Sequence, residues 1–262
     1  MKIGFIGCGN MAQAIIGGLL KQGVAGTQDI LATTSKAESA KKAAEALGIS
    51  VITENEKVAA EADILVVAVK PIFYEAVLAE IKEQIHKEQI VISIAPGKSL
   101  AWLGEQIGAD KKIVRTMPNT PALVGEGMTG VCVNENVTNG DMAKVMQVLE
   151  ACGKAEMVPE RLMDVVVSVS GSSPAYVFMF IEAMADAAVA DGMPRAQAYE
   201  FAAQAVLGSA KMVLETGKHP GELKDMVCSP GGTTIEAVRV LEAKGMRSAV
   251  IEAMKACTEK CK

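Results

Sequence analysis

The chain has 262 residues, enough for one large domain or two of moderate size, and half of them are hydrophobic. Its formal net charge of −5 comes from 26 basic and 31 acidic residues without a run of Lys or Arg, so we expect no nucleic-acid partner. Six cysteines form no CxxC pair and only two histidines are present, so we expect reduced thiols and no metal. Glycines interrupt the first apolar run, which makes it a poor signal peptide, and we expect a cytoplasmic protein.

Short β-branched runs alternate with amphipathic stretches over residues 1–159. This alternation is typical of an α/β fold with a doubly wound, mostly parallel sheet that is covered by helices on both faces. Strands are expected at Lys2–Ile6, Ile30–Thr33, Ser50–Thr53, Ile64–Val69, Ile90–Ile94, Lys112–Thr116, Gly130–Val133 and Ala155–Val158. Helices are expected in the gaps, as at Met11–Lys21, Lys36–Leu47, Phe73–Gln84 and Gly140–Ala151.

Residues 160–262 are predicted to be all-helical, because the β-type runs stop near Pro159 and long Ala/Met/Val-rich stretches follow. Three glycines have the position of helix terminators, namely Gly192, Gly217 and Gly245. The chain is therefore predicted to contain two domains, residues 1–159 and 160–262.

One segment, Val165–Ile181, carries no charge and reaches the short end of the ~17–25 residues that a membrane span requires. It contains Gly171 and Pro174, so we interpret it as a buried helix and expect no membrane partner. Residues 165–189 are apolar nearly all round, which predicts a subunit interface at this helix.

A GxGxxA pattern, formed by Gly7, Gly9 and Ala12, follows the first expected strand and opens the first helix. The first glycine permits the tight turn, the second lets a pyrophosphate approach the backbone, and Ala12 allows the helix to pack on the strand. The pyrophosphate then lies at the helix N-terminus. The pattern in this setting predicts a Rossmann domain that binds a dinucleotide.

The end of the second strand indicates which dinucleotide is bound. NAD binders usually carry an acidic residue there, whereas this chain has Thr33, Thr34, Ser35 and Lys36. Hydroxyls and a cation suit a 2′-phosphate, so we predict NADPH, with NADH as the alternative. The competing interpretation is a helix cap at Ser35 followed by a solvated lysine.

The fourth strand ends at Lys70 and Pro71, where the carboxyl ends of parallel strands face the ligand crevice. Lys70 is therefore a candidate for contact with cofactor or substrate. A surface lysine with a buried stem remains the alternative.

Two further segments are unusual for plain structure. Arg115–Ala122 places Pro118, Asn119 and Pro121 in a rigid turn at a strand end. Ser229–Thr234 precedes a helix expected at Ile235–Ala243, where two glycines beside two threonines form a backbone cradle suited to a carboxylate. The competing interpretation is a helix cap, since Thr233 and Glu236 have capping-box spacing.

The sequence resembles pyrroline-5-carboxylate reductases over nearly its whole length. The matching elements are GFIGCGNMA from Gly4, AVKP from Ala68, RTMPNTPA from Arg115, SGSSPAY from Ser170 and HPGELKDMVCSPGGTTIEAV from His219. The last element is the most specific, because it matches the family's C-terminal signature.

The resemblance implies reduction of 1-pyrroline-5-carboxylate, a cyclic imine carboxylate, to L-proline by NADPH or NADH, the final step of proline biosynthesis. It also implies a helical dimerisation domain and an active site drawn from both subunits of a homodimer, with a larger homo-oligomer left open. By position, the family's cofactor contacts fall on Ile6, Gly7, Cys8, Gly9, Asn10, Met11, Thr33, Thr34, Ser35, Lys36, Asn55, Ala68, Val69, Lys70 and Pro71. The substrate contacts fall on Ser229, the backbone of Gly232 and Thr233, and Thr234, which is also the catalytic candidate.

The chain departs from the family pattern at one position. Some members place a Glu near the imine nitrogen two residues before the HPG element, and here that residue is Gly217. The proton donor is therefore left open between Thr234 and a bound water, although a cyclic imine is basic enough to be protonated in solution.

Two other functions are weighed. A β-hydroxyacid dehydrogenase has similar domains and a catalytic lysine, but Lys70 is not in the helical half where that lysine is expected, and SPGGTT has no role there. A non-catalytic NADP sensor would bind cofactor without turnover and would need no carboxylate cradle.

Overall fold

The computed structural model describes residues 1–261, which divide into two compact units. One unit holds Met1–Ser172 together with the C-terminal residues from Cys257 onward, and the other holds Ser173–Ala256. The sequence-based domain boundary between residues 159 and 160 stays a prediction.

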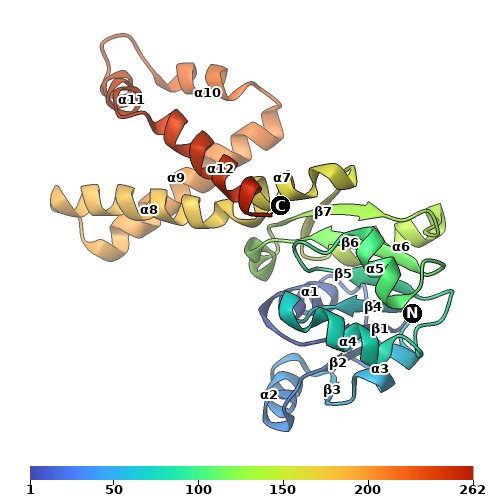
Figure 1. Ribbon diagram of the computed structural model, residues 1–262. Helices are drawn as coiled ribbons and strands as arrows, with labels where there is room; N and C mark the ends of the chain where they lie inside the picture. The colour runs from blue at the N-terminus through green and yellow to red at the C-terminus, as the bar shows by residue number, and fades with distance from the viewer. Residues whose placement is uncertain (262) are drawn as a thin grey trace. The chain divides into compact units, whose positions relative to one another are not determined.

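The first unit is built on one eight-stranded sheet with the order β3-β2-β1-β4-β5-β6-β7-β8 (Figure 1). Neighbouring strands pair in parallel, except that β6 and β7 pair antiparallel. The strands are β1 Ile3–Ile6, β2 Ile30–Thr33, β3 Ser50–Ile52, β4 Ile64–Val67, β5 Ile90–Ser93, β6 Lys112–Met117, β7 Gly127–Val133 and β8 Gly153–Met157. The first six have the Rossmann order, in which the direction of winding reverses between β1 and β4. The predicted doubly wound, mostly parallel α/β fold is confirmed.

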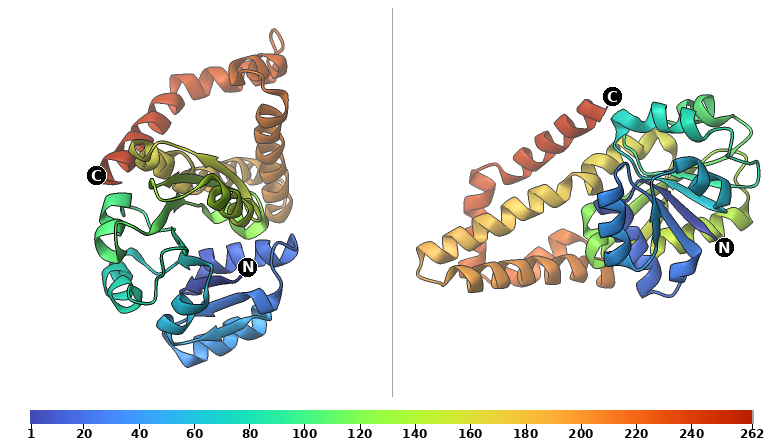
Figure 2. Two further views of the ribbon diagram at one scale, coloured as in Figure 1. Left: turned by 90° about the vertical axis from the view of Figure 1, so that its right-hand side faces the viewer. Right: turned by 90° about the horizontal axis from the view of Figure 1, so that it is seen from below.

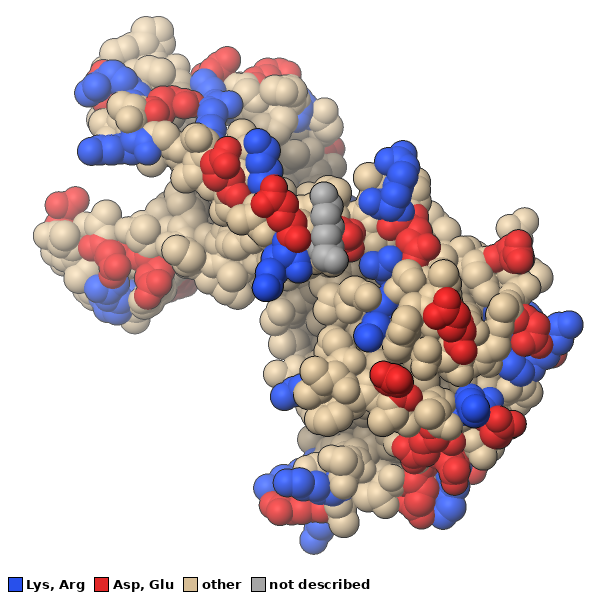
Figure 3. All heavy atoms as spheres, in the orientation of Figure 1, with Lys and Arg blue, Asp and Glu red and all other residues tan. Residues whose placement is uncertain are grey.

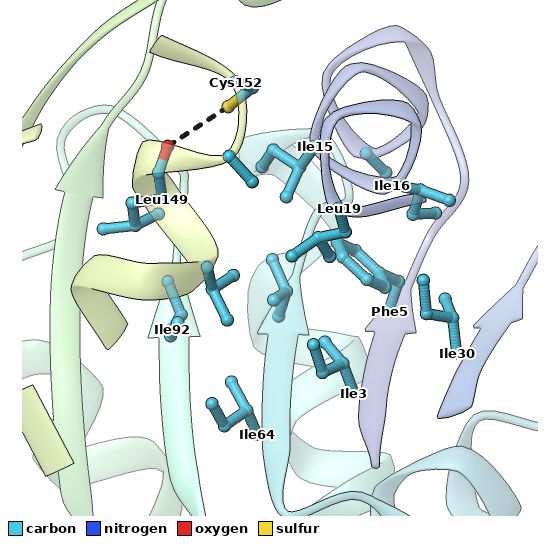
Figure 4. Close-up of a cluster of buried hydrophobic side chains, with 14 of the residues drawn as sticks. Ile3, Phe5, Ile15, Ile16, Leu19, Ile30, Ile64, Ile92, Leu149 and Cys152 are labelled. Carbon is cyan, nitrogen blue, oxygen red and sulfur yellow. Dashed lines mark hydrogen bonds between the residues drawn. The ribbon is translucent and has the colours of Figure 1, made fainter. Parts of the chain in front are cut away.

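The central strands are buried on both faces, which explains their unbroken apolar runs. Alternate side chains point to opposite faces, so Ile3 and Phe5 of β1 pack into one core and Ile6 packs into the other. Figure 4 shows the first core, in which Ile15 and Leu19 of the first helix lie over β1.

Helices cover both faces of this sheet (Figure 2). The first core is closed by α1 Asn10–Lys21, α2 Ala37–Leu47 and α6 Asn139–Glu150. The second core is closed by α3 Asn55–Glu61, α4 Tyr74–Ile81 and α5 Leu100–Ile107. With both faces covered, ligands have access to this sheet at the carboxyl ends of its strands.

The part of the chain after residue 159 is helical throughout its described length, as predicted. Within the first unit it forms α7 Met163–Val166 and a π-helix, η5, at Val167–Gly171. The helical unit is formed by α8 Ser173–Ala190, α9 Arg195–Thr216, α10 Pro220–Val227, α11 Thr233–Ala243 and most of α12 Met246–Cys261. The three predicted terminators, Gly192, Gly217 and Gly245, have φ of +97°, +64° and +74°, and each follows the end of a helix.

The apolar helical stretch Glu160–Ala190 is long and apolar enough to cross a membrane by length and composition, with a mean hydropathy of 1.4. Only 11% of its most apolar window is buried, and Phe178 and Met179 of α8 are 59% and 68% exposed. The burial expected for this helix is therefore not supplied by its own chain. An exposed apolar face of this kind is typical of a subunit interface, and the interface expected at this helix stays a prediction.

Charged side chains of both signs are interspersed on the face drawn in Figure 3. In the first unit, the buried guanidinium of Arg115 lies 3.0 Å from Glu160 Oε1 and 3.6 Å from Asp164 Oδ1, on carboxylates that are about one-third exposed. Glu160 Oε1 also accepts a hydrogen bond from the Leu100 amide at 2.7 Å. These contacts join β6, the start of α5 and the segment that leads to α7.

Arg115→Met is expected to lower the free energy of unfolding by about 2 kcal/mol, because two carboxylates that are about one-third exposed lose their cation. Urea unfolding at fixed protein concentration measures this change. The control is Arg195→Met, which breaks an ion pair with Asp186 whose side chains are 46% and 61% exposed and which we expect to cost less than about 0.5 kcal/mol. Equal losses in the two variants would contradict a stabilising role of the Arg115 pair.

Candidate active site

The turn from β1 to α1 has the form that the GxGxxA pattern predicts. Gly7 has φ of +96°, and a Cβ there would lie 2.9 Å from the Ala68 carbonyl oxygen. A Cβ on Gly9 would meet nothing within 4 Å, so the space against its backbone is open. Gly9 is the N-cap of α1 and no side chain caps this helix end, which leaves its first N–H groups for an anion. These residues fit a dinucleotide pyrophosphate.

Thr33 lies behind this turn and supports it. Its hydroxyl accepts a hydrogen bond from the Gly7 amide at 3.0 Å and donates to Asn55 Oδ1 at 2.7 Å. Asn55 Nδ2 donates in turn to Glu80 Oε2 at 3.0 Å. Because Thr33 is 1% exposed and its hydroxyl is engaged on both sides, its effect on a ligand is transmitted through Gly7.

The start of α2 contains the residues that are predicted to bind the 2′-phosphate of the cofactor. Lys36, not Ser35, is the N-cap residue, and no side chain caps α2. The alternative of a cap at Ser35 is therefore wrong, because the helix begins one residue later than such a cap needs. Thr34 Oγ1 donates to the Lys36 carbonyl at 3.0 Å, while Ser35 and Lys36 are exposed. An uncapped helix N-terminus beside an exposed hydroxyl and a cation suits a phosphate group.

A cleft of about 560 Å³ lies at the carboxyl ends of β4, β5 and β6, next to the start of α1. Predicted cofactor residues that line it are Gly9, Asn10, Met11, Ala68, Val69, Lys70 and Pro71. Lys70 is exposed at this rim, just before the 3₁₀ turn η2, Pro71–Phe73. The remaining predicted cofactor residues, Ile6, Gly7, Cys8, Thr33, Thr34, Ser35, Lys36 and Asn55, are not part of its lining.

Three further groups line the same cleft, and none of them is among the predicted site residues. They are Ile94–Pro96 after β5, Met117–Thr120 after β6, and Gly171 in η5. The rigid turn predicted at Pro118–Pro121 places Met117–Thr120 here. A signal for Ile94–Pro96 was present, because Pro96 follows the end of β5 much as Pro71 follows the end of β4.

A buried tyrosine holds the strand ends beneath the cleft. Tyr74 Oη donates to the Val67 carbonyl at the end of β4, and accepts from Ser93 Oγ at 3.2 Å and the Ile94 amide at 3.3 Å at the end of β5. Burial raises the pKa of Tyr74 to about 12, so the phenol stays neutral and keeps its proton for Val67. Thr116 Oγ1 donates to the Ser93 carbonyl at 2.9 Å and extends the connection to β6.

The predicted substrate residues lie in the helical unit, at the start of α11. The Gly232 amide donates to the Ser229 carbonyl at 3.0 Å, and Gly231 has φ of +68°, which are features of a type II turn with Pro230 in its second position. Gly232 is the N-cap of α11, and no side chain caps this end. Backbone N–H groups of Thr233 and the following residues are thus left for a carboxylate.

The capping box considered for Thr233 and Glu236 is wrong. A capping box needs its hydroxyl residue at the N-cap, and Thr233 is already the first helical residue. Glu236 instead forms an ion pair with Arg239 at 2.9 Å. Thr233 and Glu236 therefore do not cap α11 through their side chains. The backbone N–H groups at the start of this helix are still available to bind a carboxylate.

Gly217 ends α9 as its C-cap, with its amide donating to the Val213 carbonyl at 3.3 Å. Its left-handed backbone, φ +64°, disfavours a glutamate at this position. The departure from the family pattern therefore has a local structural reason, and the proton donor has to be sought elsewhere.

Three of the cysteines, Cys8, Cys132 and Cys152, are buried. Burial raises the pKa of each thiol, that of Cys132 to about 11 with a further contribution from Glu160, so they are poor nucleophiles at neutral pH. Within residues 1–261, no group of three or more His, Cys, Asp or Glu side chains is placed to hold a metal ion.

Comparison with known proteins identifies the family to which this chain belongs. Residues 160–262 match the family model for pyrroline-5-carboxylate reductase dimerisation, and residues 2–97 match the model for NADP oxidoreductase, coenzyme F420-dependent. A pyrroline-5-carboxylate reductase of Escherichia coli K12 is 58% identical over 259 residues, which are 99% of this chain and 96% of the relative. The chain belongs to the pyrroline-5-carboxylate reductase family.

Other members of the family are similar over the whole chain. The reductase of Methanosarcina acetivorans is 45% identical over 261 residues, 100% of this chain and 97% of the relative. The crystal structure of the Plasmodium falciparum enzyme with NADP bound superposes with a TM-score of 0.91 at 33% identity, covering 100% of this chain and 97% of the other. The structure from Coxiella burnetii gives a TM-score of 0.92 at 35% identity, covering 99% and 97%.

The chain is therefore an NAD(P)H-dependent oxidoreductase of the final step of proline biosynthesis. Its dimerisation domain makes it a homo-oligomer that acts on a small molecule. The hydroxyacid dehydrogenase and the non-catalytic sensor are set aside by this membership.

Proposed function

We propose that the chain, as a cytoplasmic homodimer, reduces 1-pyrroline-5-carboxylate to L-proline with NADPH bound across the β1 edge of the cleft. One observation supports this most strongly: the uncapped start of α1 opens on a cleft formed by the ends of β4, β5 and β6. In a Rossmann sheet this is the switch point at which dinucleotides bind.

The cofactor residues divide into three roles. Gly7–Met11 would hold the pyrophosphate through backbone N–H groups, with Thr33 and Asn55 fixing the turn from behind. Thr34–Lys36 would hold the 2′-phosphate at the start of α2. Ala68–Pro71 would border the nicotinamide half. Bound NADPH supplies the hydride for the imine carbon.

The substrate carboxylate is assigned to the turn at the start of α11. The Gly232 amide closes the turn on the Ser229 carbonyl, so the backbone N–H groups from Thr233 onward are assigned to the carboxylate, together with the hydroxyls of Ser229 and Thr234. These groups orient the ring, so the main contribution of the chain is proximity and orientation. The imine arrives protonated from solution, and Thr234 or a water that it holds accounts for any remaining proton transfer.

The preference for NADPH is tested at Lys36. Lys36→Glu is expected to lower kcat/KM for NADPH about 10-fold and to leave kcat/KM for NADH within about twofold, because an exposed cation near the 2′-phosphate becomes an anion. Lys41→Glu, which makes the same charge change at another exposed position of α2, is the control. An equal loss with both cofactors would remove Lys36 from the 2′-phosphate site.

The reaction itself is tested with NADPH that carries deuterium at the transferable position of nicotinamide C4. We expect one deuterium per molecule of proline, located by mass spectrometry and NMR at the δ-carbon, which was the imine carbon. Proline without the label, or oxidation of NADPH without proline, would contradict direct hydride transfer to the imine.

A further inference from the structure

Asn119 uses both ends of its side-chain amide to bind backbone at the cleft. It follows β6, is 8% exposed and lines the cleft with its neighbours Pro118 and Thr120. Its Oδ1 accepts a hydrogen bond from the Met128 amide at 2.8 Å, and its Nδ2 donates to the Ser170 carbonyl at 3.0 Å. One side chain thus links the end of β6, the start of β7 and the π-helix η5.

The Ser170 carbonyl needs a donor from outside its own α-helical pattern. In a regular helix it would accept from the amide of residue 174, but that residue is Pro174, which has no N–H. The segment instead forms a π-helical turn, in which the Ser172 amide donates to the Val167 carbonyl at 2.7 Å. π-Helical turns of this kind often occur at functional sites. Asn119 Nδ2 supplies a hydrogen bond to the carbonyl that Pro174 cannot satisfy.

The residue after this carbonyl, Gly171, is part of the cleft lining and packs closely on Met117, since a Cβ on Gly171 would lie 2.7 Å from Met117 Cε. The wall of the cleft on the β6 side therefore consists of Met117–Thr120 and Gly171, and Asn119 joins these two parts. Thr34–Lys36 follow β2, on the opposite side of β1. The two halves of a dinucleotide lie on opposite sides of the switch point between β1 and β4. The β6-side wall therefore borders the nicotinamide half.

We propose that Asn119 is a positioning residue for the reduction, one that acts through Ser170 and Gly171 to hold the wall of the cleft that borders the dihydronicotinamide ring. This inference rests on the proposed function. It assigns Asn119 no contact with the reacting atoms. Its contribution is to keep the β6-side wall in place, and misplacement of a reacting group by about 1 Å can cost about 100-fold in rate.

The test separates positioning from general stability. Asn119→Asp keeps the size of the side chain and the acceptor for Met128, but it replaces the donor to Ser170 with a carboxylate oxygen. We expect kcat to fall about 10–100-fold. The dissociation constant of 2′,5′-ADP, which carries the 2′-phosphate but no nicotinamide, should stay within about twofold of wild type. Asn119→Ser, which adds no charge, should lower kcat in the same direction and serves if the aspartate variant does not fold.

Asn134 provides a matched control. Its Oδ1 accepts from the Ile113 amide at 3.0 Å and its Nδ2 donates to the Lys111 carbonyl at 2.8 Å, so it makes the same pair of bonds at the other end of β6. Asn134→Asp should lower the thermal unfolding temperature but leave kcat within about twofold of wild type. Equal loss of kcat in the Asn134 and Asn119 variants, wild-type kcat in both Asn119 variants, or a parallel loss of 2′,5′-ADP affinity would overturn the inference.

Failure of the proposed function would be recognised separately, because the wild-type chain would then not reduce the imine. In that case the ratio of the NADPH affinity to the 2′,5′-ADP affinity tests whether Asn119 positions the wall beside the nicotinamide. We expect the Asn119→Asp variant to bind NADPH at least about threefold more weakly with unchanged 2′,5′-ADP affinity, and an unchanged ratio would overturn the inference.

Discussion

Gly9→Ala is expected to lower the affinity for NADPH about 100-fold while the thermal unfolding temperature stays unchanged. A Cβ at this position meets nothing within 4 Å in the protein, so the fold accommodates it. The same methyl group occupies the space through which a pyrophosphate reaches the start of α1. Loss of one or two hydrogen bonds to a charged group, at about 1.5–3 kcal/mol each, accounts for an effect of this size.

Isothermal titration with NADPH and thermal unfolding measure the two quantities on the same preparations. Gly140→Ala is the matched control, because Gly140 lies in the first turn of α6 and its Cβ would make only an ordinary contact, 3.8 Å from Thr138 Oγ1. This control should keep its NADPH affinity. If Gly9→Ala binds NADPH as tightly as Gly140→Ala, the pyrophosphate does not lie on the β1–α1 turn.

Thr234→Ala is expected to raise KM for 1-pyrroline-5-carboxylate and to lower kcat/KM about 10–100-fold, with KM for NADPH unchanged. Thr234 lies in the first turn of α11, where no side chain caps the helix, and we assign its hydroxyl to the substrate together with the backbone cradle. Removal of the hydroxyl leaves that cradle and the helix in place. The variant should therefore change the kinetic constants for the imine and leave KM for NADPH unchanged.

Steady-state kinetics with each substrate varied in turn make this test. Thr216→Ala removes another threonine hydroxyl from the helical unit, one that donates to the Met212 carbonyl within α9, and it should leave both KM values unchanged. Wild-type kinetics of Thr234→Ala would take Thr234 out of the site and leave any remaining proton transfer to a bound water.

Much of the fold was readable from the sequence because it depends on local patterns. Each of the eight predicted strands is present, and the signal is strongest in β1, β4 and β5, whose apolar runs are buried on both faces. The GxGxxA turn was equally local, because Gly7 and Gly9 act within a few residues of each other. Family membership followed from motifs that a single chain carries in full.

Other parts of the site depend on which strands become neighbours. Tyr74, Ile94–Pro96 and Asn119 matter because β4, β5 and β6 lie side by side, so that their ends meet at one cleft. Nothing local to Asn119 indicates that it binds the Ser170 carbonyl, 51 residues away. The capping box failed for the opposite reason: its spacing was right, but the type II turn starts α11 at Thr233 itself.

The apolar side chains of helix α8 are not buried by the rest of the same chain. Its apolar side chains were visible in the sequence, yet within the chain only Ala185 of this helix is buried. The dimerisation family model covers residues 160–262, so we expect the remaining side chains to be buried against another copy.

Oxidation of NADPH in the presence of 1-pyrroline-5-carboxylate, with a panel of keto acids as the comparison, tests whether the chain reduces this imine. We expect rapid oxidation with the cyclic imine, formation of one proline per NADPH consumed, and no turnover with the keto acids. Cofactor binding without turnover of the imine, or turnover with the keto acids alone, would contradict this expectation.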